Sequence, residues 1–543
     1  MTVYVVGLDG VPPALLNRGI NSGYLPAFEK ILEEGVEGKT RSTTPPVSMM
    51  AWSTFATGKK PGNHGIFNFL IKEASGYDTD FATRSLLEAS ATPIWDYLDA
   101  EGIESGVMNI MPGYPPSKSL GFHIADHITT PPNGKYTHPE SLQDRITNKF
   151  EKFRLGPLTG YSPGDGEEAL NNYVKKFFSI EKERVELGKY LVQENNCPMM
   201  AIVFSAPDIF LHEIGHLLYE DHPKYDQELA QKNNKLPMRL LNLYDSFLSW
   251  LTDQMEGDDS ILILSDHGHG PIHKAINLNS WLYQNGYLTL KNRPSTVLKK
   301  YGYNYLYESV ERLMKKFKIY EAIKQGIAHA SNTDSGVDLS KLLTIQSSDI
   351  KWSETEAFTV AGDGQVYINS TKHRDGKVAP AEYEKLRSEL ASRLKKMEDP
   401  ETGELILSEV HYGGDLYEGK QSDQRPDLIC IPKPTYRIKF PQTMRTSNHI
   451  VLPQKYGGHS SKDELFGIFA AYGESIRKEE GVTMSLEDFV PTIMMLMGLP
   501  IPKEVDGECR TEITTKSSEV VSKDYTGRIK SKEAVRTVVE NLR

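Results

Sequence analysis

With 543 residues, 38% of them hydrophobic and 25% charged, the chain is long enough for one large elaborated domain or two domains, and its composition is not that of a disordered protein. Its 62 basic and 73 acidic residues give a formal net charge of −11 without a long basic run, which argues against a large nucleic acid as partner. The 3 cysteines lie far apart and outside any CxxC pattern, so a disulfide framework and a thiolate zinc site are both disfavoured.

The N-terminus passes directly into the apolar run Val3–Val6, and no basic region or cleavage site of an export signal precedes it. The most apolar stretches, residues 261–264 and 489–499, are shorter than the roughly 20 residues that a transmembrane helix needs. We therefore expect a cytoplasmic protein that has no membrane partner.

Three short apolar runs that end in polar residues predict parallel strands buried on both faces: residues 3–8, 201–205 and 261–265. Helical patterns lie between them, for example at residues 25–34 and 181–194. This alternation predicts an α/β sandwich around a mainly parallel sheet, in which ligands bind beyond the carboxyl ends of the strands. Asp9, Asp208 and Asp266 are therefore expected at one rim of the sheet.

Two segments look like additions to this core. Residues 113–175 are rich in Pro, Gly and Tyr, which predicts a long ordered excursion. Residues 291–345 are rich in Lys and Tyr with helical periodicity, which predicts a helical cap inserted into a discontinuous catalytic domain of residues 1–290 and 346–508. Each addition either covers a substrate or only packs on the surface.

The C-terminal tail, residues 509–543, ends in a predicted helix with one apolar face, formed by Val535, Val538, Val539 and Leu542. That face docks either on the body of the protein or on a second subunit. Homo-oligomerisation is thus one of two open arrangements.

Five segments of the chain supply oxygen and nitrogen donors suited to metal ions: Asp9 in LDG, Ser48 in PPVSMMAW, Asp208 and His212 in DIFLH, Asp266 and His267 in SDHG, and His459 in YGGHS. Carboxylates and imidazoles together suit zinc, manganese or iron. Taken singly, each residue is weak evidence, because an Asp after a strand is more often a helix cap or turn former.

The order of these motifs and the residues that flank them resemble those of the alkaline phosphatase superfamily. The resemblance is strongest to its type I phosphodiesterase and nucleotide pyrophosphatase family. The resemblance covers about residues 1–508 and includes Thr57-Gly58, the phrase Pro61-Gly62-Asn63-His64-Gly65, and Val490-Pro491-Thr492. It implies an alkaline-phosphatase-like fold with two divalent metal ions, zinc first and manganese as the second candidate. It also implies which residues hold them: Asp9, Ser48, Asp266 and His267 for one ion, and Asp208, His212 and His459 for the other.

Ser48 is predicted to be the nucleophile that forms a phosphoseryl intermediate. It precedes a helical pattern in which Trp52, Phe55 and Ala56 share a face, so its oxygen is expected at a helix N-terminus, where amide groups favour an alkoxide and a phosphate. A plain Ser N-cap is the alternative. By the resemblance, Asn68 donates to a phosphate oxygen, and a turn role is equally compatible with its position.

The implied substrate is a small phosphate ester, with a nucleotide among the candidates. The implied reaction is hydrolysis of a phosphodiester or nucleotide pyrophosphate bond. Because Ser48 stands where the phosphodiesterase branch commonly has Thr, a phosphomonoesterase or phosphonate hydrolase is the alternative. Sulfatase chemistry is disfavoured, since the residues after Ser48 are Met49, Met50, Ala51 and Trp52 rather than the xPxR that sulfatases need.

A zinc protease is a competing interpretation of the segment HEIGHLLYEDH. In it, His212, His216 and His222 would bind zinc and Glu213 would be the general base. Tyr219 replaces the glycine of the longer motif, and this interpretation leaves four other metal-ligand segments unexplained. We therefore favour the phosphohydrolase.

Overall fold

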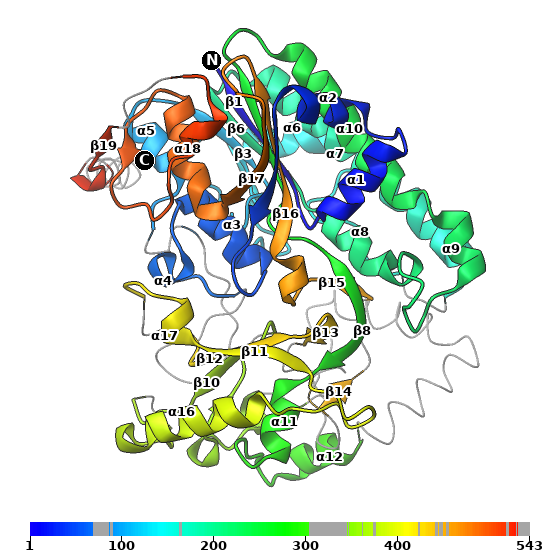
Figure 1. Ribbon diagram of the computed structural model, residues 1–543, viewed down its shortest axis with the longest axis vertical. Coiled ribbons are helices and arrows are strands. Elements are labelled where there is room, and N and C mark those ends of the chain that lie inside the picture. The colour runs from blue at the N-terminus through cyan, green and yellow to red at the C-terminus, as the bar shows by residue number, and fades with distance from the viewer. Residues whose placement is uncertain are drawn as a thin grey trace.

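The protein is described by a computed structural model, shown as a ribbon in Figure 1. The described residues are 1–68, 86, 91–161, 165–302, 345, 347–360, 362–372, 376–421, 424–439, 444, 449–451, 456–516, 521–527 and 529. Most of the predicted cap, residues 303–344, and the predicted C-terminal helix, residues 531–543, lie outside them. No helix in the described part of the chain is long and apolar enough to cross a membrane.

A nine-stranded sheet forms the centre of the larger lobe, in the order β17-β2-β16-β7-β1-β6-β3-β4-β5. The strands are β1 Val3–Leu8, β2 Val36–Arg41, β3 Ser105–Met108, β4 Phe122–Ile124, β5 Thr137–His138, β6 Met199–Phe204, β7 Ser260–Leu264, β16 Phe466–Gly473 and β17 Glu479–Ser485. β1 pairs in parallel with both β6 and β7, and β3 continues the parallel set. β16 is antiparallel to its neighbours β7 and β2. The predicted mainly parallel sheet is confirmed.

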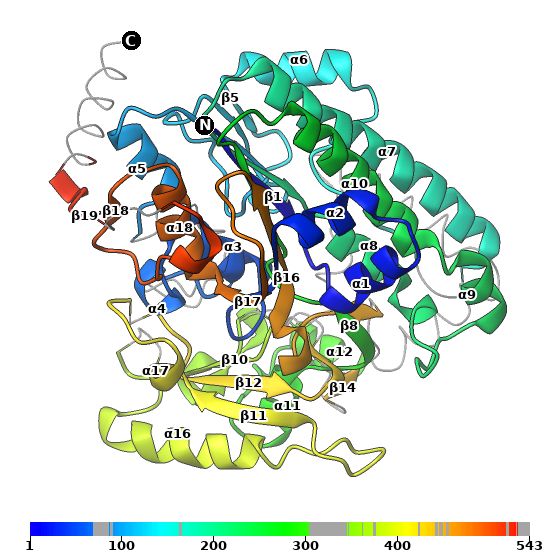
Figure 2. The same cartoon turned by 45° about the horizontal axis from the view of Figure 1, so that its top comes forward.

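Side chains of the central strands alternate between two hydrophobic cores. In β1, Val3 and Val5 enter one core, whereas Tyr4, Val6 and Leu8 enter the other. The first core is covered by α3 Ser48–Thr57, α5 Ile94–Ala100 and α18 Phe489–Leu496. The second is covered by α1 Pro13–Asn21, α2 Pro26–Glu34, α6 Ser141–Lys149, α7 Glu167–Glu194 and α10 Leu236–Gln254. Figure 2 shows these two groups on opposite sides of the sheet, which confirms the α/β sandwich.

The excursion predicted at residues 113–175 is ordered in its described part. It contributes β4 and β5 to one edge of the central sheet and α6 to the second core. The excursion therefore extends the large lobe as part of its framework.

A smaller lobe, formed between Ile276 and Ile450, has its own hydrophobic core. Its antiparallel sheet runs in the order β11-β12-β10-β9, with β9 Ala357–Phe358, β10 Gln365–Ile368, β11 Leu407–Tyr412 and β12 Leu428–Pro432. Its helices are α11 Leu278–Gln284, α12 Pro294–Gly302, α16 Pro380–Leu394 and α17 Gly413–Leu416. α12 lies in the segment predicted as a cap, of which residues 303–344 are not described. The lobe lies below the large one in Figure 1.

A long strand joins the two lobes. β8 Gly270–Ile276 pairs with β13 Thr435–Ile438 in parallel, and with β14 Ile450–Val451 and β15 Gly457–Gly458 in antiparallel orientation. β8 begins three residues after His267, and β15 ends immediately before His459. The junction between the lobes therefore carries two of the predicted metal-binding segments.

Asp245 of α10 supplies the N-terminal cap that α2 lacks. The residue before α2, Leu25, has no side-chain oxygen, and Asp245 instead accepts hydrogen bonds from the backbone N–H groups of Ala27 and Phe28 at 3.3 and 2.9 Å. We predict that Asp245→Ala lowers the free energy of unfolding by about 1–3 kcal/mol, because two amide donors lose their acceptor. Chemical denaturation measures the change. Asp253→Ala, at an exposed position on the same helix, is the control and should leave stability nearly unchanged; equal effects of the two substitutions would contradict this role.

Candidate metal centre

Three neighbouring strand ends carry the predicted carboxylates. Asp9 follows β1, Asp266 follows β7, and Asp208 lies in the first turn of α8 Ala206–Ile214, just after β6. The N–H of Gly10 donates to Asp266 Oδ1 at 3.2 Å, which ties the first two ends together. Gly10 has a φ of +69°, and a Cβ on it would lie 2.7 Å from that of Asp208. The glycine of LDG thus lets the chain turn tightly between two of the carboxylates.

Ser48 is the first residue of α3, as its helical pattern predicts. Its Oγ lies 3.0 Å from His267 Nε2, and the side chain is buried. One turn later, Trp52 Nε1 donates to Asp9 Oδ2 at 3.3 Å. α3 is therefore held against two of the strand ends, with the Ser48 oxygen at its N-terminus.

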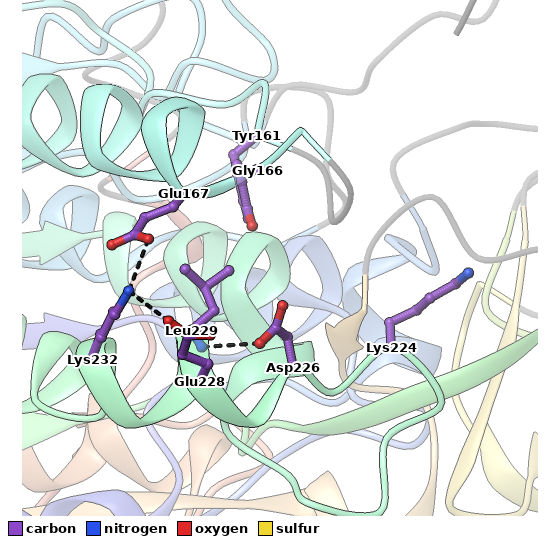
Figure 3. A pocket seen from close by; sticks show the side chains of 8 residues that line it. All are labelled: Tyr161, Gly166, Glu167, Lys224, Asp226, Glu228, Leu229 and Lys232. Atoms are coloured by element: carbon purple, nitrogen blue, oxygen red, sulfur yellow. Dashed lines mark hydrogen bonds and ion pairs between the residues drawn. The ribbon is translucent and has the colours of Figure 1, made fainter. Parts of the chain in front are cut away.

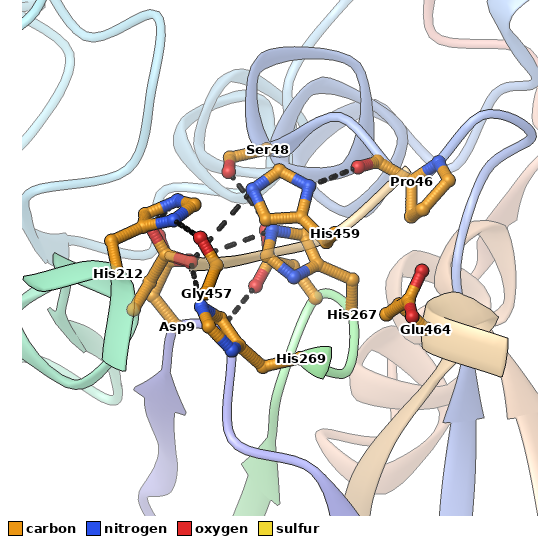
Figure 4. Close-up of polar contacts among 12 residues, drawn as sticks. Asp9, Pro46, Ser48, His212, His267, His269, Gly457, His459 and Glu464 are labelled. Carbon is orange, nitrogen blue, oxygen red and sulfur yellow. Dashed lines mark hydrogen bonds and ion pairs between the residues drawn. The ribbon is translucent and has the colours of Figure 1, made fainter. Parts of the chain in front are cut away.

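Three histidines are locked in one tautomer by backbone carbonyls, as Figure 4 shows for His212 and His459. The Nδ1 atoms of His212, His267 and His459 lie 2.5, 2.8 and 2.6 Å from the carbonyl oxygens of Gly457, Gly268 and Pro46. A carbonyl only accepts, so each Nδ1 carries a hydrogen, and in the neutral form of each ring Nε2 presents a lone pair. The Ser48 hydroxyl consequently donates to His267 Nε2.

The Nε2 atoms face carboxylate oxygens. His212 Nε2 lies 3.3 Å from Asp208 Oδ2, His267 Nε2 lies 3.2 Å from Asp266 Oδ2, and His459 Nε2 lies 3.7 Å from Asp208 Oδ1. Burial and the neighbouring His267 hold the pKa of His459 well below its ordinary value, so this ring is neutral. A lone pair facing a carboxylate is unfavourable unless a cation lies between them.

Each of the three carboxylates has one oxygen that no hydrogen-bond donor reaches within the described part of the chain. Asp9 Oδ1, Asp208 Oδ1 and Asp266 Oδ2 are buried without a hydrogen-bond partner among the described residues. Burial, together with the charges of Asp266 and Asp208, raises the pKa of Asp9 well above its ordinary value. Burial and Asp208 likewise raise the pKa of Asp266 to about 7. Bound cations would remove this penalty, so the donor set fits divalent metal ions.

The structure brings all seven predicted metal-site residues into one cluster. Three sets of possible ligand atoms lie close together: Asp9, Asp266 and His267; Asp208, His212 and His269; and Asp208, His267 and His459. The first set matches three of the four residues that the resemblance assigns to one ion. His459 lies between the two predicted groups, since its ring stacks on His267 with centroids 3.7 Å apart.

His269 belongs to this cluster, although the motifs did not identify it as a ligand. Both of its ring nitrogens are buried and have no hydrogen-bond partner in the described ranges, and burial with the neighbouring His212 holds its pKa well below the ordinary value. The available signal was its spacing. His269 stands two residues after His267, just beyond the DHG motif.

Asn68 lies at the junction between the lobes. Its Nδ2 is 3.3 Å from the carbonyl oxygen of Gly362 and 3.5 Å from Asp363 Oδ2, both in the small lobe. A contact between Asn68 and a phosphate oxygen remains a prediction.

The zinc-protease interpretation does not fit the geometry. α8 ends at Ile214, so the HEIGH segment is not one continuous helix that presents both of its histidines on a single face. Both ring nitrogens of His222 are engaged, with the carbonyl of Ile272 and the N–H of Lys224, each at 3.0 Å. In the described part of the chain, no set of possible ligands combines His212 with His216. His212 instead joins Asp208, four residues before it.

A separate pocket of about 320 Å³ lies between the Tyr161 loop and α9 Gln227–Asn233 (Figure 3). None of the seven predicted metal-site residues lines it. Lys232 pairs with both Glu167 and Glu228 at 3.0 Å, so its positive charge is already taken up by acidic neighbours. The metal cluster is therefore the stronger candidate site.

Comparison with known proteins gives one family match. A family model described as type I phosphodiesterase / nucleotide pyrophosphatase matches residues 3–461. Comparison with curated protein sequences finds no match.

Solved structures with similarity to the chain include murine ectonucleotide pyrophosphatase/phosphodiesterase 5, at 14% identity and a TM-score of 0.47 over 94% of this chain and 98% of that one. An inactive form of the murine protein in complex with AMP has 15% identity and a TM-score of 0.46, over 94% and 97%. Phosphonoacetate hydrolase from Sinorhizobium meliloti in complex with phosphonoformate has 14% identity and a TM-score of 0.48, over 87% and 89%.

The two histidines of HEIGH provide a direct test of the site. We predict that His212→Ala lowers the bound divalent metal of reconstituted protein by about one ion per chain, since it removes one of the few ligands of that ion. His216→Ala, the matched control, should keep the wild-type metal content, because His216 stacks on Tyr161 outside the cluster. Elemental analysis by mass spectrometry measures both. Equal metal loss in the two variants would restore the protease interpretation.

Proposed function

Because the chain belongs to the type I phosphodiesterase and nucleotide pyrophosphatase family of hydrolases, we propose that it hydrolyses phosphodiester or nucleotide pyrophosphate bonds of small substrates through a phosphoseryl intermediate on Ser48. One observation carries the proposal. The Ser48 oxygen lies at the N-terminus of α3 and 3.0 Å from His267, beside a buried cluster of carboxylates and imidazole lone pairs that a cation would satisfy.

We assign the two proposed metal sites from this geometry and the family motifs. Asp9, Ser48, Asp266 and His267 would hold one ion, and Asp208, His212 and His459 would hold the other, with His269 within reach of the second. Zinc is our first choice and manganese the second, because mixed carboxylate and imidazole donors suit both. When bound, such ions would neutralise the charge of a phosphoryl group and lower the pKa of the serine hydroxyl.

The protein's own residues perform the rest of the proposed reaction. The 3.0 Å contact between Ser48 Oγ and His267 Nε2 places the serine oxygen beside the atom with which His267 would hold its ion, and the amide groups at the start of α3 stabilise negative charge on that oxygen. Ser48 gives its hydroxyl proton to solvent and attacks phosphorus in line. An Oγ–P bond forms while the bond to the alcohol or nucleotide breaks, and the leaving oxygen departs with that electron pair and takes a proton from solvent. Water then cleaves the phosphoseryl bond and regenerates Ser48. Asn68 is proposed to contact a phosphate oxygen from the lobe junction.

A phosphomonoesterase or phosphonate hydrolase is the second candidate, favoured by serine rather than threonine at position 48. We also propose a cytoplasmic location, which fits three cysteines that all remain unpaired. Residues 291–345 remain our proposed cap over the catalytic domain.

Hydrolysis of bis-p-nitrophenyl phosphate beside p-nitrophenyl phosphate tests the proposal. We predict that metal-reconstituted protein prefers the diester, and that Ser48→Ala lowers kcat by about 1000-fold or more while metal content stays nearly intact. Asp266→Ala should lose activity together with metal.

Ser53→Ala is the matched control, because this buried serine of α3 only donates to the carbonyl of Met49. Its activity should stay within about twofold of the wild-type value. Unchanged turnover in Ser48→Ala would rule out the serine nucleophile, and a monoester preference would favour the second candidate.

A further inference from the structure

Arg437 faces the metal cluster from the small lobe. It lies on β13 between Tyr436 and Ile438, whose side chains are buried in the small-lobe core. Successive side chains of a strand point to opposite faces, so Arg437 points away from that core. Its Nη1 lies 3.4 Å from His212 Nδ1.

This contact does not satisfy the guanidinium. His212 Nδ1 carries a hydrogen, which it donates to the carbonyl of Gly457 at 2.5 Å. It therefore has no lone pair that could accept a hydrogen bond from Arg437. Among the described residues, the Arg437 side chain has no other hydrogen-bond acceptor and no carboxylate within ion-pair distance. A guanidinium keeps its charge and offers five N–H donors. Arg437 is thus a charged donor without an assigned acceptor, at the edge of the cluster.

The surrounding chain leaves room for Arg437. A Cβ on Gly458 would lie 3.2 Å from Arg437 Nη1 and 3.2 Å from His212 Cε1, so the glycine before His459 lets the guanidinium approach the ligand loop. Asp363, which is buried beside Asn68, feels the charge of Arg437. Burial raises the pKa of Asp363, and Arg437 and Asn68 offset part of that rise.

We propose that Arg437 binds a second anionic oxygen of the substrate. This oxygen is distinct from the one whose negative charge the proposed metal ions would neutralise. Among phosphodiesters and pyrophosphates, the site would therefore favour those that carry more than the single negative charge of a simple diester. The inference rests on the proposed function and narrows its substrate class. A charge-assisted hydrogen bond from a guanidinium to a phosphate or carboxylate oxygen is short and strong, whereas a substrate with one charge leaves these donors unfilled.

The second anionic oxygen could lie on the reacting phosphorus or on the leaving group. Three substrates distinguish these two cases. Bis-p-nitrophenyl phosphate has one negative charge and is the reference. p-Nitrophenyl phosphate adds a third non-bridging oxygen on the reacting phosphorus. ATP cleaved to AMP and pyrophosphate keeps a diester-type reacting phosphorus and places the extra charge on the leaving group.

We expect Arg437→Ala to lower kcat/KM by about 10- to 100-fold on at least one of the two more highly charged substrates, and by less than about threefold on the diester. Arg437→Lys should recover part of the loss, because it restores charge without the fork of donors. Arg387→Ala is the matched control, since that small-lobe arginine of α16 pairs with Glu384. Thermal unfolding and metal content should match wild type in all variants.

Equal losses on all three substrates would overturn the inference, because Arg437 would then act only by holding His212. So would the absence of any loss. A binding measurement separates this inference from the proposed function. Calorimetric titration of metal-reconstituted Ser48→Ala with inorganic phosphate should show at least about tenfold weaker binding once Arg437→Ala is added. If the wild-type protein hydrolysed none of the substrates, the hydrolase proposal would be refuted. If Arg437→Ala left phosphate binding unchanged, the proposed role of Arg437 would be refuted.

Discussion

The polar centre of the molecule depends on the direction in which three imidazole rings are held. His212, His267 and His459 each give the Nδ1 hydrogen to a backbone carbonyl, so three lone pairs are directed at buried carboxylates. Those contacts are unfavourable by themselves in a medium that water does not screen. The strand ends, the start of α3 and the loop before His459 must therefore be held in place by the rest of the fold. Two cores on opposite faces of the central sheet provide that support.

Much of the large lobe could be predicted because its signals are local. The runs at residues 3–8, 201–205 and 261–265 correspond to β1, β6 and β7, with shifts of no more than about two residues at their ends. Parallel strands share one carboxyl edge, so the convergence of Asp9, Asp208 and Asp266 followed from the topology. The helix that begins at Ser48 followed from a short apolar pattern.

The features that were missed depend on contacts between distant residues. The small-lobe core joins Ile276 to Ile450 through antiparallel strands of two to six residues, which are too short for a clear alternating pattern. Arg437 belongs to no motif, and its importance appears only when β13 pairs with β8 beside His212. His212 itself fits two motifs at once, because a histidine four residues after Asp208 is also the first histidine of HEIGH. The end of α8 at Ile214 distinguishes them, and Gly215 directly after it is a residue type that often ends helices.

The position of β16 has a consequence for how the chain is made. This strand lies between β7 and β2 in the central sheet, although it comes hundreds of residues later than β2 in the chain. During synthesis on the ribosome, β2 therefore has no partner on this sheet until β16 emerges, and His459 emerges only shortly before β16. A nascent chain holds Asp9, Ser48 and Asp208 long before the cluster can close. The central sheet and the proposed ligand set are therefore completed together.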